Sequence, residues 1–333
     1  MKLVLLTADN LPRSAGELRS APATADVAAL VPKLATTRPA ERSLLEWLAP
    51  APVRPPGVKV AHPDDVADRS RKEEHFAIHD QFFGVFRALG TAPELFAHAI
   101  LVGYRDILRE VLESGTSLTD EQWGDLRWGL EEAIRFAAAV PGLDRRPLPP
   151  PPAGRVRPDP HRRWRVGHHA FFPLIQSVVV GLNCFETALL AEDERAAAEA
   201  LRFATAAMSA SASAMRFASD FPPAQYGGVV RRAMAPPFLP VGLSGVMSED
   251  HVQLIRCFHA LHELLPTLTG ELAELRDRFV DVVETVYVAH TGVCARFEGD
   301  HIVSLRMSDS SSATAVDVLV QLRKSRLKIL RQS

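Results

Sequence analysis

Cysteine is scarce in this sequence, which has three in 333 residues: Cys184, Cys257 and Cys294. A sparse and odd-numbered set does not build the disulfide framework of a small secreted domain, so that class of protein is excluded. A surplus of either charge is missing too, because 38 basic and 40 acidic residues leave a formal net charge of −2. This balance disfavours nucleic acid and anionic membrane surfaces as main partners.

Long hydrophobic runs are also lacking, although 47% of the residues are hydrophobic. No apolar stretch reaches the roughly 18 residues of a membrane span, so we expect no membrane-spanning helix. The opening MKLVLLTADN has a short apolar run and no small-residue cleavage site, so we predict no signal peptide. We therefore expect a cytoplasmic protein with one large domain or two ordinary ones.

Strand signals are nearly absent, and helical periodicity predicts a mainly α fold. We expect helices over 73–90, 93–115, 117–140, 168–190, 193–219, 249–265, 271–298 and 313–331. Prolines rule out a helix in PGLDRRPLPPPPAGRVRPDPHRRW (141–164) and favour an extended linker or surface loop. We therefore divide the chain into a smaller N-terminal helical region (1–145), a Pro-rich linker (146–165) and a helical domain (166–333). The role of residues 1–70 is not indicated by any motif.

The segment YVAHTGVC (287–294) places a histidine and a cysteine one turn apart. In 271–298, His290 fills the gap in an apolar stripe at helical spacing: Leu275, Phe279, Val282, Val286, Val293 and Phe297. A second stripe, on 249–265, extends back to His251 and contains Leu254, Phe258, Leu261 and Leu265. Both histidines are therefore expected on buried helix faces, and the 38 residues between them allow the two helices to fold back on each other.

Taken singly, a histidine or a cysteine on an apolar stripe is usually a packed core residue. Two histidines and a cysteine in register suggest a prosthetic group instead. A zinc site that includes His259 and His262 is one alternative, but zinc prefers four ligands at shorter local spacing. Heme suits the pattern better, because imidazole is a standard axial ligand and heme needs a wide apolar slot between helices. Cys294, one turn from His290, is then placed near the porphyrin edge, where a thiol can add to a vinyl group.

The order His251, 38 residues and HTGVC (290–294) resembles the H-x(n)-H-x3-C heme motif of the 3-methyl-L-tyrosine hydroxylases of saframycin-type biosynthesis. That group belongs to the histidine-ligated heme-dependent aromatic oxygenases, with the tryptophan and indoleamine dioxygenases. The resemblance implies a helical heme domain of the dioxygenase-like type, with the N-terminal region covering the substrate side. It also implies His251 and His290 as iron ligands and a single thioether from Cys294 to the heme.

Two weaker matches suggest the substrate pocket. The segment PAQYGGVVR (223–231) is similar to the family segment whose arginine binds the substrate carboxylate, which implies this role for Arg231, with Tyr226 lining the pocket. Gly227 and Gly228 depart from the family, because relatives often carry a second aromatic there. The segment HHAFFPL (168–174) resembles the paired-phenylalanine entry to the first heme-domain helix, which implies Phe171 and Phe172 as substrate contacts.

A third match is SDSSSATAVDVL (308–319), which resembles the Gly/Ser-rich loop that closes over the substrate side. It implies Ser311 and Ser312 as cofactor-binding residues. The loop lacks the GTGGSSG glycines of tryptophan dioxygenases, which disfavours that reaction.

The proposed chemistry needs an acid/base group and a contact to the substrate phenol. We expect His251 to be the labile distal ligand, because it stands at a helix start and helix ends fray, and to serve as acid/base for peroxide. EEHFAIHDQFF (73–83) contains His79, which we predict to contact the phenol from the N-terminal region. Six other histidines are expected to be structural or exposed: His98, His168, His169, His259, His262 and His301.

The resemblance implies hydrogen-peroxide-dependent ring hydroxylation of a tyrosine derivative, with 3-methyl-L-tyrosine to its catechol as the preferred reaction, in the biosynthesis of an antibiotic natural product. The partners expected are this small aromatic amino acid and peroxide, and family members often pair as homodimers. Three alternatives remain at this point: dioxygen-dependent cleavage of an indole ring, a bis-histidine heme protein without a substrate, and a helical scaffold without metal. The sequence leaves the substrate, the oxidant and the labile histidine undecided.

Overall fold

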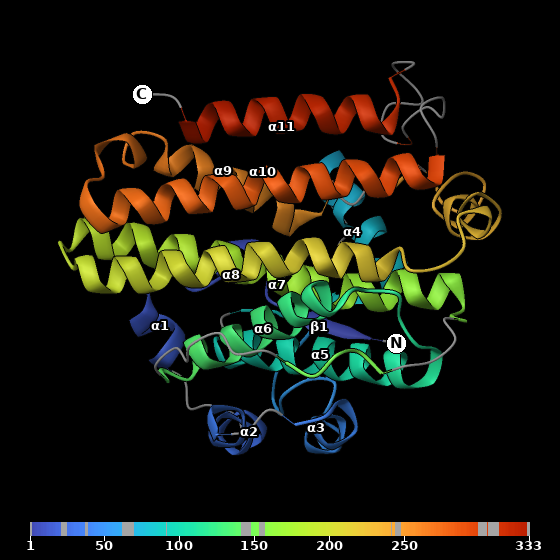
Figure 1. Ribbon diagram of the computed structural model, residues 1–333, viewed down its shortest axis with the longest axis horizontal. Coiled ribbons are helices and arrows are strands. Elements are labelled where there is room, and N and C mark those ends of the chain that lie inside the picture. Colours follow the sequence, from blue (N-terminus) through green and yellow to red (C-terminus); the bar gives the residue numbers. More distant parts are fainter. Residues whose placement is uncertain are drawn as a thin grey trace.

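The architecture is that of a computed structural model, which describes residues 2–20, 25–36, 39–61, 70–90, 92–140, 148–152, 157–240, 242–243, 248–298, 305 and 313–331. Helices dominate this part of the chain, which confirms the mainly α prediction. The longest helices lie in layers with their long axes roughly parallel (Figure 1).

The central layer is a pair of helices, α7 (Pro160–Leu190) and α8 (Glu194–Ala218), which pack along each other. Below them in Figure 1, α5 (Glu94–Ser114) packs on α7 and α6 (Asp120–Ala137) packs on α8. These helices are buried on most faces, so the centre of the molecule is a continuous apolar core.

The C-terminal helices form the layers above this pair. Here α9 (Glu249–Leu261) packs on α7, and α10 (Gly270–Glu298) packs on α8. The last helix, α11 (Ala315–Arg331), covers α9 and α10 and lies at the top of Figure 1. Short turns complete this half, the π-helical turn η2 (Tyr226–Arg231) and the 3-10 turn η4 (Leu265–Thr267).

Most of the N-terminal elements lie around the lower layers (Figure 1). The N-terminal elements are β1 (Leu3–Leu5), the 3-10 turn η1 (Ala8–Asn10), α1 (Ala15–Ser20), α2 (Ala25–Thr36), α3 (Glu41–Leu48), α4 (Arg71–Phe83) and β2 (Val85–Arg87). The two strands pair in parallel, with Val4 opposite Phe86. They hold the start of the chain against the end of α4.

The helix expected over 73–90 is wrong in its second half. Helix α4 ends at Phe83 because Gly84 adopts a left-handed conformation, with φ of 69°, that closes the helix. The residues that follow, Val85 to Arg87, then pair with β1, which sequence periodicity did not reveal. Pairing with a strand so distant along the chain overrides the local helical preference.

The predicted linker (146–165) is also too long at its end, because α7 begins at Pro160 and residues 160–165 are helical. Proline is well tolerated in the first turn of a helix, where its missing N–H has no helical partner. Asp159 caps this start by accepting a hydrogen bond from the backbone N–H of Arg162 at 2.7 Å. The division into two domains stays a prediction, and one core runs through both, with Phe136 stacked on Phe203 at 4.1 Å.

One helix, α7, is long and apolar enough to be tested as a membrane span, although no apolar run of that length was expected from the sequence. Among the described residues, Pro160–Leu190 passes that test by length and composition alone. However, 67% of its apolar window is buried inside the protein, as in the core helix of a folded domain.

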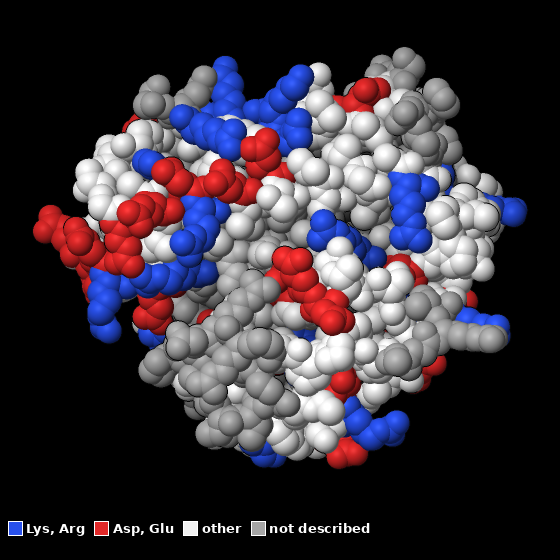
Figure 2. All heavy atoms as spheres, in the orientation of Figure 1, with Lys and Arg blue, Asp and Glu red and all other residues white. Residues whose placement is uncertain are grey.

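The view in Figure 2 shows Lys and Arg gathered over α11, with acidic and basic side chains interspersed elsewhere on that face.

Candidate active site

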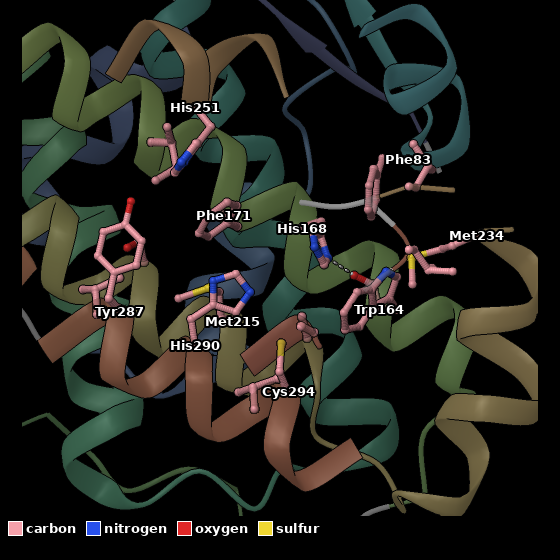
Figure 3. Close-up of a pocket in the computed structure, with 18 of the residues that line it drawn as sticks. Phe83, Trp164, His168, Phe171, Met215, Met234, His251, Tyr287, His290 and Cys294 are labelled. Carbon is pink, nitrogen blue, oxygen red and sulfur yellow. Dashed lines mark hydrogen bonds between the residues drawn. The ribbon is translucent and has the colours of Figure 1, made fainter. Parts of the chain in front are cut away.

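A cavity with an empty volume of about 1130 Å³, its open mouth included, lies among the C-terminal helices. Its walls come from α7, α8, α9 and α10, with further residues from η2 and its neighbourhood, as the close-up in Figure 3 shows. Most lining side chains are apolar, including Ile175, Met208, Leu254, Val286 and Val293. This is the setting that a flat hydrophobic cofactor or an aromatic ligand requires.

His251 on α9 and His290 on α10 both line this cavity. The two helices contact each other through Phe258 and Phe279, whose ring centres are 6.1 Å apart. His251 lies two turns before Phe258 on α9, and His290 lies three turns after Phe279 on α10. The cavity separates the two helices at this end. The fold therefore brings into one cavity two imidazoles that are far apart in the sequence.

His290 is held as a neutral imidazole. Burial lowers its pKa to about 4, because the low-dielectric surroundings disfavour the protonated ring. In the described part of the chain, no residue forms a hydrogen bond with this ring, and its partial exposure is to the cavity that it lines. A neutral imidazole retains a nitrogen lone pair, which is the form that binds a metal ion.

Cys294 lines the cavity one helical turn after His290, and Figure 3 shows both side chains rising from the same face of α10. The other two cysteines, Cys184 and Cys257, are buried elsewhere in the core. Burial raises the pKa of both these thiols to about 12, so they remain protonated and inert. Of the three cysteines, Cys294 is therefore the one that lines the cavity.

The start of α9, directly before His251, is anchored firmly. Ser248 accepts a hydrogen bond from the backbone N–H of His251 at 3.2 Å. The side chain of Asp250 is fully buried and accepts hydrogen bonds from Arg87 at 2.9 and 3.0 Å and from Gln176 at 2.8 Å. Fraying of this helix end is therefore not a source of lability for His251, since three side chains hold it, and the lability itself stays a prediction.

Arg87 joins a second carboxylate to this network, because it also donates to Asp80 at 2.8 and 3.0 Å. Burial alone would raise the pKa of Asp80, but the adjacent guanidinium holds it below its usual value. The network links α4, β2, α7 and α9. The N-terminal region therefore positions the wall of the cavity that carries His251.

The predicted substrate residues Arg231, Tyr226 and Phe171 also line the cavity. Tyr226 is buried, and its ring stacks on Phe297 of α10 at 4.4 Å. Arg231 ends the π-helical turn η2, a rare geometry that is frequent at functional sites. Gly227 and Gly228 lie in the same turn, and a side chain at either position would meet open space.

Two other predicted residues lie outside the cavity wall. Phe172 is 1% exposed, and His79 is fully buried. The His79 ring contacts Phe83 at 4.9 Å and Phe172 at 5.4 Å, and its Nδ1 lies 3.6 Å from Asp80. Because Asp80 is drawn toward Arg87, this face of α4 turns into the core. His79 does not line the cavity in this arrangement, so it does not make the direct phenol contact predicted for it. Phe83 of the same helix lines the cavity instead.

Ser311 and Ser312, the predicted cofactor-binding serines, lie outside the described residues. The sequence reasoning in turn missed His168, Trp164 and Tyr287, which all line the cavity. His168 was expected to be structural or exposed. A signal was available, because His168 stands one helical turn before Phe171 and shares its helix face.

Close packing of α7 on α8 shapes the floor of the cavity. Only glycine fits at position 167, because a Cβ atom there would lie 2.3 Å from the Cβ of Ala218. Ala218 itself lines the cavity. The two backbones can therefore approach closely at this point, which places His168 beside the end of α8.

The donor set fits heme better than a metal held by protein side chains alone. Within the described ranges, no group of three or more His, Cys, Asp or Glu side chains could hold a metal ion. His259 is exposed, and the ring of His262 bonds the backbone carbonyl of Ile329 at 2.7 Å, so neither joins the cavity. The zinc alternative has no support here. Two imidazoles and one thiol in an apolar slot match heme ligation.

Comparisons with known proteins agree on one family. The family model described as SfmD 3-methyl-L-tyrosine peroxygenase matches residues 4–278. A 3-methyl-L-tyrosine peroxygenase from Streptomyces lavendulae is 30% identical over 312 residues, which cover 92% of this chain and 80% of the relative. A crystal structure of reduced SfmD, soaked with sodium hydrosulfite, is similar with a TM-score of 0.68 and 26% identity, covering 89% of this chain and 98% of that one.

Proposed function

The chain belongs to the SfmD 3-methyl-L-tyrosine peroxygenase family, and from this premise we propose that it hydroxylates the ring of a tyrosine derivative with hydrogen peroxide. As a member of a peroxygenase family it is an oxidoreductase. In the proposed reaction one aromatic C–H becomes C–OH, and the second peroxide oxygen leaves as water. 3-Methyl-L-tyrosine, the compound in the relative's name, is the preferred substrate, and a catechol is the product.

One observation carries the proposal: His251, His290, Cys294 and Arg231 line the same apolar cavity. His251 and His290 would hold the iron of a heme. The thiol of Cys294 would add across one vinyl group, with sulfur bonded to one carbon and hydrogen to the other. When bound, the heme supplies the metal centre that activates peroxide as the oxidant. The same ligand set supports a place for the family among the histidine-ligated heme aromatic oxygenases.

The remaining cavity residues bind and orient the substrate. Arg231 would clamp the amino-acid carboxylate, because guanidinium forms two parallel, charge-assisted bonds with a carboxylate. Tyr226 and Phe171 would flank the aromatic ring. The apolar wall excludes bulk water, which strengthens the ion pair with Arg231.

His251 would be the ligand that moves to admit peroxide. Because Asp250 and Ser248 anchor the backbone, its imidazole must leave by rotation of the side chain rather than by fraying of α9. The displaced imidazole could take a proton from one peroxide oxygen and return it to the other. His290, in the middle of the wall formed by α10 and beside Cys294, would stay in place.

The first test is whether heme remains with the polypeptide in acid and acetone, followed by absorbance and intact mass. We expect retention in the wild type, loss in Cys294→Ser, and retention in the control Cys257→Ser, whose thiol is buried away from the cavity. Heme extracted cleanly from the wild type would refute the thioether. A protein that takes up no heme would overturn the proposed function.

The second test is product formation with peroxide and 3-methyl-L-tyrosine. A mass increase of one oxygen, dependent on peroxide and not on dioxygen, supports hydroxylation. Ring cleavage of tryptophan with dioxygen would support the dioxygenase alternative instead. A heme protein that changes neither compound would be a bis-histidine heme protein without a substrate.

A further inference from the structure

We propose that Nε2 of His168 accepts a hydrogen bond from the phenol of the aromatic substrate and thereby fixes the orientation of the ring. The inference rests on the proposed function and assigns one further substrate contact to the same site. His168 lies on α7, lines the cavity, and is 7% exposed. Figure 3 shows it between Trp164 and Phe171, on the opposite wall from His290 and Cys294.

A single hydrogen bond determines which nitrogen of His168 carries a proton. Nδ1 lies 2.7 Å from the backbone carbonyl oxygen of Trp164. A carbonyl oxygen only accepts, so Nδ1 must be the N–H that donates. In the neutral ring the proton is then absent from Nε2, which keeps a lone pair. No described residue forms a hydrogen bond with Nε2, so a ligand in the cavity is its available partner.

Aromatic neighbours hold the ring in place. His168 stacks on Phe83, with ring centres 4.3 Å apart and an angle of 25° between planes. Trp164 lies at 4.6 Å, Phe172 at 5.6 Å and Phe171 at 6.1 Å, so packed rings surround the imidazole. A side chain fixed in this way forms a hydrogen bond without losing rotational freedom, which makes the contact directional.

The same surroundings keep the ring neutral. Burial lowers the pKa of His168 to about 3, in spite of the carbonyl of Trp164, which favours the protonated form. Any positive charge on His79, His169 or His290 would lower it further. An imidazolium is therefore strongly disfavoured at neutral pH. His168 acts as a hydrogen-bond acceptor that positions the phenol, and not as a base that removes its proton.

The position of His168 relative to Arg231 allows the two residues to hold opposite ends of the substrate. Arg231 lines the cavity from η2, and Trp164, one turn before His168, lies near Tyr226 of the same turn at 5.7 Å. A substrate whose carboxylate is held by Arg231 would be fixed only at one end. An acceptor on α7 adds a second polar contact at the phenol, so that the ring cannot turn over in the apolar slot.

The test compares two ligands that differ by one hydroxyl group. Binding of 3-methyl-L-tyrosine and of 3-methyl-L-phenylalanine to the heme-loaded full chain is measured by calorimetry. We expect the wild type to prefer the phenol by about tenfold, the size of one well-formed hydrogen bond. In His168→Phe, which keeps the stacked ring but has no acceptor, the two ligands should bind equally.

Two further variants make the result specific. His168→Gln should restore part of the preference, because its side-chain carbonyl can accept from the phenol. His161→Phe, on the same helix but outside the cavity lining, should leave the preference unchanged. Absorbance of the heme and the melting temperature report correct folding, and His168→Leu replaces His168→Phe if the latter does not fold.

A preference that persists in His168→Phe or His168→Leu would overturn the inference. Equal binding of both ligands by the wild type would overturn it as well, and hydroxylation of the tyrosine derivative would then still support the proposed function. A wild type that binds neither ligand and hydroxylates nothing would instead refute the proposed function itself, and the inference with it.

Discussion

Arg87 forms a two-bond ion pair with Asp250, the residue directly before His251, at nitrogen–oxygen distances of 2.9 and 3.0 Å. Asp250 is wholly buried and Arg87 is 9% exposed, so solvent screens the pair very little. The pair joins strand β2 to the start of α9. It explains how the N-terminal part of the chain sets the position of a cavity-lining histidine.

Arg87→Met should therefore destabilise the protein by about 3–5 kcal/mol, because it leaves the buried carboxylates Asp250 and Asp80 without their cation. Unfolding in urea measures this loss. Arg256→Met is the matched control, since Arg256 is 57% exposed and pairs with Asp9 at 3.5 Å. An exposed pair of this kind contributes at most about 1 kcal/mol. Equal effects of the two substitutions would contradict the role given to Arg87.

The two cavity histidines should differ when each is replaced. His290→Ala should take up little heme, since the ligand beside Cys294 is missing before the thioether can form. His251→Ala should keep heme but lose about 10²–10⁴-fold in turnover with peroxide, the usual contribution of a positioned acid/base group. Heme content is read from the absorbance of the purified protein, with the exposed His259→Ala as control. Heme loss in His251→Ala alone would reverse the two roles.

Arg231→Gln should weaken binding of the amino-acid substrate through its carboxylate. We expect kcat/KM to fall by about 10–100-fold, mostly through KM, because a charge-assisted bidentate pair is lost. The neighbouring Arg232 is exposed and lies over the ring of Phe238 at 5.3 Å, so Arg232→Gln is the matched control. If the control loses as much as Arg231→Gln, the carboxylate contact is assigned to the wrong arginine.

Gly167→Ala should destabilise the protein by about 1–3 kcal/mol, because the added methyl group meets the backbone of Ala218 and forces α7 from α8. Thermal unfolding of the apoprotein measures this. Gly124→Ala on α6 is the control, because a Cβ there meets nothing within 4 Å. Alanine in a helix site with this much open space should be neutral or stabilise by up to about 1 kcal/mol.

The apoprotein should lose stability as pH falls from about 6.5 toward 4. The native pKa of His290 is lowered to about 4, whereas its ordinary value is 6.5. Between these values the unfolded chain binds a proton that the native chain does not, so acid favours unfolding. His290→Phe should show a smaller loss between pH 7 and 5 than the wild type, measured by urea unfolding. Parallel curves for the two proteins would show that His290 titrates normally.

Local periodicity was enough to predict much of the fold. The helices that carry His290, Cys294 and His251 were predicted from apolar spacing, since side chains three and four residues apart share one helix face. The one-turn relation of His290 to Cys294 follows from the same geometry. Strand β2 was missed because its partner, β1, lies about 80 residues away, and three residues carry too little local signal.

The sequence by itself determined the mainly α fold, the faces of its helices and the family to which the histidine and cysteine pattern belongs. Tertiary structure alone decided which residues meet across the cavity. It turned His79 into the core with Asp80, brought His168 to the cavity wall, and joined Arg87 to Asp250 across 163 positions of sequence. The physical reason is that helical periodicity acts within a few residues, whereas burial, ion pairing and close helix packing depend on segments that only the folded chain brings together.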